Sequence, residues 1–93
     1  MNDSSNRSIE PRVAKIVQSL LAERRPGINL GVDDGLREHG LTSLDMVKLV
    51  LLIEAEFDFM IAESEMVPLN FRSIATIAVL VEKSMTAADQ TLA

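Results

Sequence analysis

Residues 42–57, which read TSLDMVKLVLLIEAEF, decide the fold of this chain. Thr42 and Asp45 have the spacing of a capping box, in which each side chain bonds the backbone N–H of the other residue at the start of a helix. Asp is shorter than the preferred Glu, so the match to the pattern is loose. The stretch predicts a helix that begins just after Thr42 and ends near Phe57.

This helix carries more apolar side chains than one buried face can use, because ten of residues 44–57 are apolar. One set has the spacing of a core-facing stripe: Met46, Leu49, Val50, Ile53 and Phe57. A second set lies at positions i, i+3 and i+7: Leu44, Val47 and Leu51. Two explanations are open. Either the helix is central and packed on all sides, or the second set docks a partner, with Asp45 and Glu54 at its rim.

Two further helices flank this one. Helical spacing of apolar residues predicts a helix from about residue 9 to Arg24–Arg25, with Pro11 near its start and Pro26 after its end. It buries Ile9, Val13, Ile16, Val17, Leu20 and Leu21. A last helix is predicted over residues 73–83, and it buries Ile74, Ile77, Ala78 and Val81. One short turn around residues 63–66, stopped by Pro68, separates the last two long helices.

The connection over residues 26–41 lacks a helical period and contains all four glycines of the chain. Loops of this length in a compact domain are often functional. We expect it to be pinned to the core by Leu30, Val32, Leu36 and Leu41, with a turn at residues 33–35. The fold class is therefore all-α: a small four-helix bundle with three main helices, a short third helix and a long first loop. The domain spans residues 9–83, between flexible tails at 1–8 and 84–93.

Composition excludes several functions. The chain has 93 residues, no Cys, and nine basic against fourteen acidic residues, a net charge of −5. Such acidity disfavours nucleic-acid and anionic-membrane binding and suits basic protein partners. No P-loop or nucleophile-elbow motif occurs, no metal-ligand spacing occurs, and the single His, His39, lacks an orienting carboxylate. We expect a soluble, cytoplasmic, monomeric protein that is not an enzyme and has no metal site or membrane span.

Residues 40–47, GLTSLDMV, resemble the attachment motif of the acyl carrier protein family, in which Asp-Ser-Leu opens the second helix. The likeness extends from Ile9 to Lys83 and includes the long loop, the short third helix and the Phe57-x-x-x-Ile61 spacing. It implies that Ser43 carries 4'-phosphopantetheine, donated by coenzyme A, with an acyl or aminoacyl group held on it as a thioester. A helix start suits the phosphate of this group, because its free N–H groups and dipole favour an anion. The implied partners are a phosphopantetheinyl transferase, a loading enzyme and an acceptor enzyme.

The chain departs from the family pattern near the attachment serine. Thr42 stands where Asp is usual, Lys48 where an acid is common, and Ala62 where Pro often follows Ile61. We interpret these departures as a specialised carrier with its own enzymes, and a role in general fatty acid or lipid biosynthesis as the alternative within the family. The candidate docking residues are Thr42, Leu44, Asp45, Val47, Lys48, Leu51 and Glu54. The alternative from another class is an unmodified acidic helical docking module, which would not need the Ser43 hydroxyl.

Overall fold

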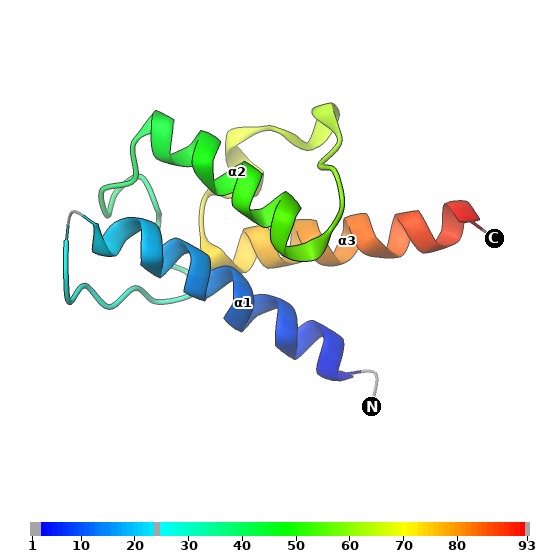
Figure 1. Cartoon of the computed structure of the whole chain (residues 1–93), viewed down its shortest axis with the longest axis horizontal. Helices are drawn as coiled ribbons and strands as arrows, with labels where there is room; N and C mark the ends of the chain where they lie inside the picture. Colours follow the sequence, from blue (N-terminus) through cyan, green and yellow to red (C-terminus); the bar gives the residue numbers. More distant parts are fainter. Residues whose placement is uncertain (1–2, 24, 93) are drawn as a thin grey trace.

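Three α-helices form the framework in the part of the chain that the structure describes. This computed structural model describes the backbone of residues 3–23 and 25–92, and the side chains of residues 9–86 other than 24. The elements in chain order are α1 (Asp3–Ala22), α2 (Ser43–Phe57), the 3-10 turns η1 (Glu63–Glu65) and η2 (Pro68–Phe71), and α3 (Ile74–Leu92). Helix α1 packs against both α2 and α3, and η2 packs against α3 (Figure 1). The all-helical class expected from the sequence is confirmed.

The core lies where the apolar stripes of the three helices meet. Helix α1 contributes Ile9, Val13, Val17, Leu20 and Leu21. Helix α2 contributes Leu49, Ile53 and Phe57, and α3 contributes Ile74, Ile77, Ala78, Leu80 and Val81. Met46, Val50 and Ile16 are partly buried against this cluster. The helical spacing in the sequence therefore identified the core-facing side of each helix correctly.

The first helix is longer at its start than the sequence predicted. It begins at Asp3 rather than Ile9, and Pro11 therefore lies inside it. Pro11 has no N–H to donate to the carbonyl of residue 7, so one hydrogen bond of the helix is missing. The sequence prediction started the helix at Ile9 because Pro is favoured in the first turn. Residues 3–5 are Asp, Ser and Ser, and both residue types are favoured at a helix start. They were the sequence signal for the earlier start of α1. The helix ends at Ala22, before the predicted Arg24–Arg25; residues 1, 2, 24 and 93 lie outside the described residues.

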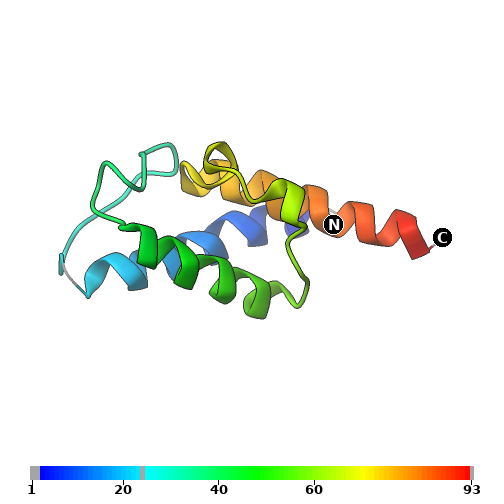
Figure 2. The same ribbon diagram turned by 90° about the horizontal axis from the view of Figure 1, so that it is seen from above.

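The last helix runs on to Leu92, through most of the segment that was expected to be a tail (Figure 2). Residues 84–92 contain Met, Ala, Gln and Leu and no Gly or Pro, so no residue stops the helix there. At its other end, Ser73 and Thr76 bond each other reciprocally. The Ser73 N–H donates to Thr76 Oγ1 at 3.0 Å, and the Thr76 N–H donates to Ser73 Oγ at 3.2 Å.

Pro68 begins a turn instead of ending one. The predicted short turn is present as η1, but η2 follows directly and has Pro68 at its first position. The fixed φ of Pro suits the first residue of a helical turn, and its missing N–H would have no partner there. The expected short third helix is therefore two 3-10 turns, and the second brings Phe71 into the core.

The long loop is tied to the start of α3 by its backbone. The Leu36 N–H donates to the Arg72 carbonyl at 2.8 Å, and the Ala75 N–H donates to the Val32 carbonyl at 2.9 Å. Leu36 and Leu41 are buried and Leu30 packs on the core, as expected. Val32 was expected to be a side-chain anchor, but its side chain is 41% exposed. Its carbonyl makes the contact instead, because the first N–H groups of α3 need acceptors outside the helix.

No helix among the described residues has both the length and the apolar character needed to cross a bilayer.

Candidate functional site

The start of α2 is a fully formed capping box. Thr42 is the N-cap in an extended conformation, and its Oγ1 accepts from the Asp45 N–H at 3.2 Å. Asp45 Oδ2 accepts from the Thr42 N–H at 3.0 Å. Asp is therefore long enough to close the box, in spite of the loose sequence match. Ser43 lies between the two capping residues as the first residue of the helix, and it is exposed.

The backbone around Ser43 is suited to an anion. The N–H groups of Ser43 and Leu44 have no hydrogen-bond partner among the described residues, and both residues are exposed. Unpaired N–H groups and the positive end of the helix dipole stabilise a phosphate at a helix start. A phosphodiester on the Ser43 hydroxyl would lie within reach of both groups, so these residues fit a phosphopantetheine group.

The loop before Ser43 is folded into a tight turn. The Leu41 N–H donates to the Leu36 carbonyl at 3.1 Å, and His39 Nδ1 donates to the Gly35 carbonyl at 2.7 Å. Gly40 has a φ of 114°, which favours glycine. His39, the single His of the chain, is half-buried and serves this turn. The expected turn near residues 33–35 is also present, where the Gly31 N–H donates to Asp34 Oδ2 at 2.7 Å.

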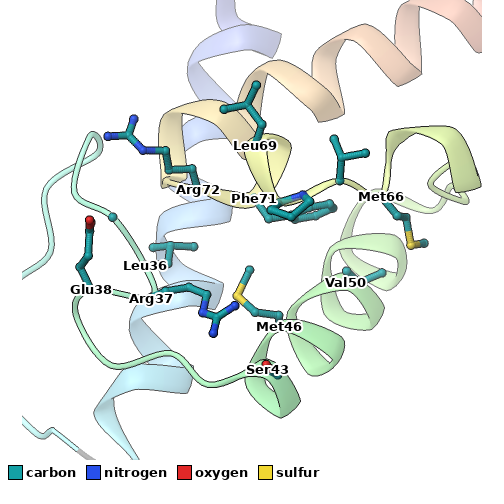
Figure 3. A pocket seen from close by; sticks show the side chains of 13 residues that line it. Leu36, Arg37, Glu38, Ser43, Met46, Val50, Met66, Leu69, Phe71 and Arg72 are labelled. Atoms are coloured by element: carbon teal, nitrogen blue, oxygen red, sulfur yellow. The ribbon is translucent and has the colours of Figure 1, made fainter.

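A pocket of about 550 Å³ opens beside Ser43. Its wall is made by the loop around Leu36, by Met46 and Val50 of α2, and by residues 66–72 (Figure 3). The lining is mostly apolar, with Arg37, Glu38 and Arg72 at its edge. Sequence analysis missed this pocket, because its wall combines three segments that are far apart in the chain. The apolar residues around Pro68 were the one signal that could have indicated it.

The second apolar stripe of α2 faces solvent. Leu44 is 65% exposed, Val47 56% and Leu51 60%. This excludes the alternative in which α2 is packed on all sides, and it agrees with the exposure that the docking explanation requires. Thr42 and Lys48 are also exposed beside these residues. Exposed apolar groups at helical spacing form a surface that a partner protein can cover.

The two carboxylates expected at the rim of this stripe are occupied within the fold. Asp45 is only 4% exposed and belongs to the capping box. Glu54 is half-buried, and its Oε2 accepts from the Ile61 N–H at 2.8 Å. The rim position predicted for Asp45 is therefore wrong, because a box-closing side chain must fold back onto the backbone. Glu54 serves the segment after α2 in the same manner.

A small helical domain with an exposed serine at a capped helix start has the architecture of a carrier for a covalently attached group. The family described as "Phosphopantetheine attachment site" matches residues 11–81. The chain therefore belongs to the phosphopantetheine-binding carrier proteins, and phosphopantetheine is its cofactor. It is a non-catalytic carrier of thioesters, as the sequence predicted. Among the described residues, no group of side chains could hold a metal ion.

Two curated relatives come from Bradyrhizobium diazoefficiens. The first, "Aminoacyl carrier protein 1", is 40% identical over 72 residues, which cover 77% of this chain and 80% of the relative. The second, "Aminoacyl carrier protein 2", is 36% identical over 67 residues, which cover 72% of this chain and 75% of the relative.

Solved structures of carrier proteins also match this chain. This chain is similar to a chain in the crystal structure of a Bradyrhizobium japonicum glycine:[carrier protein] ligase complexed with its cognate carrier protein and an analogue of glycyl adenylate. The identity is 39% and the TM-score 0.69, over 81% of this chain and 97% of that one. Because nearly all of that chain is covered by this short one, the match is to a carrier protein. A second match, with a TM-score of 0.67 and 39% identity, comes from the ligase complexed with glycylated carrier protein and covers 77% of this chain and 97% of that one.

Proposed function

We propose that Ser43 is the attachment residue and that the arm carries an aminoacyl group as a thioester. The observation that supports Ser43 is its position as an exposed residue at the start of α2, beside the two unpartnered N–H groups of Ser43 and Leu44. In the transferase reaction the Ser43 hydroxyl oxygen attacks the phosphorus of coenzyme A that bears the pantetheine arm. The pyrophosphate bond breaks, the adenosine bisphosphate half of coenzyme A leaves, the hydroxyl proton is released, and a phosphodiester remains on Ser43. The chain has no Cys, so the reactive thiol comes from the attached group.

The nature of the carried group is inferred from the relatives. The two curated relatives are named aminoacyl carriers, and the matched structures contain a glycine:[carrier protein] ligase. These names support an aminoacyl group and an ATP-dependent ligase as the loading enzyme. Nothing in them supports a role in fatty acid or lipid biosynthesis, so we propose the specialised role over the general one. An acceptor enzyme then takes the aminoacyl group from the thioester.

The proposed docking surface is the exposed side of α2 next to Ser43. It combines the apolar stripe of Leu44, Val47 and Leu51 with the exposed polar residues Thr42 and Lys48. Apolar groups at the centre of an interface set the dissociation rate, whereas charges at its edge set the association rate. Asp45 and Glu54 act within the fold instead: Asp45 closes the capping box at the start of α2, and Glu54 holds the segment after α2 through the Ile61 N–H.

The attachment is tested by intact-mass measurement. The apo protein is incubated with coenzyme A and a broad-specificity phosphopantetheinyl transferase, and we expect a gain of one phosphopantetheine mass. Ser43→Ala should show no gain, whereas Ser64→Ala, which removes an exposed serine from η1, should gain the mass as the unchanged protein does. A gain that persists in Ser43→Ala would refute the assignment, and no gain in any form would favour an unmodified docking module.

The carried group is tested on the modified protein. The holo form is incubated with ATP, each amino acid in turn and a glycine:[carrier protein] ligase, and the product is followed by mass and by its release with hydroxylamine. We expect a hydroxylamine-labile gain equal to one aminoacyl residue. If acyl-ligase enzymes load fatty acids onto the holo form while every aminoacyl ligase tried fails, the aminoacyl proposal is wrong.

A further inference from the structure

Arg37 lies in a part of the long loop whose backbone is fixed relative to α2. The residue before it, Leu36, is fully buried and donates its N–H to the Arg72 carbonyl at 2.8 Å. The Arg37 carbonyl accepts from the Gly40 N–H at 3.2 Å, within the turn that leads to Thr42. The same turn therefore fixes the backbone position of Arg37 and leads the chain into Thr42 and Ser43.

The Arg37 side chain reaches toward the attachment serine. It is exposed, and it lines the same pocket as Ser43 and Met46. Figure 3 shows it extending from the loop toward the first turn of α2, whereas the side chains of Glu38 and Arg72 point away from Ser43. The Arg37 guanidinium makes no hydrogen bond or ion pair with any other residue that the structure describes. Its charge is available for a group attached at Ser43.

A phosphodiester at Ser43 places one negative charge at this location. A guanidinium binds phosphate oxygens with two parallel N–H donors, which gives direction as well as attraction. The carboxylates nearby do not compete for it: Asp45 is buried in the capping box, and Glu38 extends along its own loop, away from Ser43.

We propose that Arg37 is a positioning residue that binds the phosphodiester on Ser43. This contact directs the first part of the phosphopantetheine arm toward the pocket and away from the apolar stripe of α2. This rests on the proposed attachment at Ser43. Arg37 takes no part in bond making. By drawing the phosphate to the pocket side, it leaves Leu44, Val47 and Leu51 uncovered for a partner enzyme while the arm waits for its load.

The ³¹P NMR signal of the holo protein reports on the phosphodiester directly. We compare the unchanged protein with Arg37→Gln and with the matched control Arg72→Gln, which removes the same charge from the same pocket edge. Arg37→Gln should shift the ³¹P resonance. It should also lengthen the ³¹P transverse relaxation time, because a released phosphodiester moves faster than the protein tumbles. Arg72→Gln should leave both unchanged. The difference should shrink as salt is raised, because an exposed ion pair is screened. Arg37→Lys should restore part of the shift, since it returns the charge without the fork of donors.

The outcomes separate this inference from the attachment itself. Intact mass is measured first, and a missing phosphopantetheine mass on the unchanged protein would refute the attachment at Ser43. If the mass is present but the ³¹P signal of Arg37→Gln matches that of the unchanged protein at low salt, the role of Arg37 is refuted alone. Equal shifts in Arg37→Gln and Arg72→Gln would also refute it, because they would indicate that the ³¹P resonance responds to the total charge nearby and not to a direct contact with Arg37. Melting curves of the apo forms verify that all variants are folded.

Discussion

Thr42 and Asp45 bond each other's backbone across Ser43, at 3.0 and 3.2 Å, so the residue that carries the hydroxyl is held by its neighbours and takes no part in holding the helix. This separation of roles has a direct consequence. The serine hydroxyl can be modified or removed without disturbing the helix start. The capping side chains cannot be changed so freely, because each satisfies an N–H group that the helix leaves unpaired.

Asp45→Ala should therefore destabilise the domain by about 1–2 kcal/mol, since it removes one half of the cap and leaves the Thr42 N–H unpaired. Ser43→Ala should change the free energy of unfolding by no more than about 0.5 kcal/mol. Urea denaturation of both apo variants measures these values. Equal losses in the two variants would mean that Ser43 also supports the helix.

Val47→Ala should slow modification and loading while leaving stability within about 0.5 kcal/mol, because Val47 is exposed at the centre of the apolar stripe. Leu49→Ala, two residues further on the same helix, is the contrasting variant. It empties a fully buried position and should cost about 2–5 kcal/mol. Thermal melts and loading rates are measured for both. A large drop in the melting temperature of Val47→Ala with unchanged kinetics would place the stripe in the core.

Thr42→Asp combined with Lys48→Glu should make the carrier a better substrate for enzymes of general fatty-acid synthesis and a poorer one for its own loading enzyme. Each exposed charge contributes roughly 0.2–1 kcal/mol to partner binding, so the two together contribute about 0.4–2 kcal/mol, which is about twofold to thirtyfold discrimination between partners. Asp can cap the helix in place of Thr, so folding should persist.

Acylation rates across a salt series measure this effect, which should be largest at low salt. Lys15→Glu on α1 is the control, because it reverses an exposed charge on another helix. If the double variant and the unchanged protein show the same rates at every salt concentration, Thr42 and Lys48 do not set partner choice.

Glu54→Ala should destabilise the domain by about 1 kcal/mol, because it removes the acceptor for the Ile61 N–H. Glu54→Gln keeps an acceptor oxygen and loses only the charge, so most of the stability should remain. Unfolding and loading are measured for both variants. A normal melting curve together with slow loading in Glu54→Gln would instead assign the Glu54 charge to partner docking.

The helical faces were predictable because burial repeats along a helix with a fixed period. Leu49 and Ile53 on α2, and Ile77 and Val81 on α3, are all buried as their spacing indicated. The attachment motif was equally local, since Thr42, Ser43 and Asp45 act within one turn of helix. Where all the residues of an interaction lie within one helical turn, the sequence alone is sufficient to predict that interaction.

Contacts between distant segments were not predictable in this way. Val32 was expected to pin the long loop through its side chain, but the contact is made by its carbonyl, which accepts from the Ala75 N–H in the first turn of α3. Asp45 was placed at a rim from its charge, although the capping box already required it to fold back. The pocket depends on Met46, Leu36 and Leu69, which come from separate segments and meet only after the chain folds.

The two backbone bonds that tie the long loop to Arg72 and Ala75 also set an order of events during synthesis. A ribosome that has made the chain as far as α2 has produced Ser43 and its cap, but not the residues that hold the preceding loop in place. A transferase that reads the loop and helix start together meets its complete substrate only after residue 75 has left the exit tunnel. For such a transferase, a chain that stops before Arg72 and Ala75 would present Ser43 without the tied loop and would be a poor substrate.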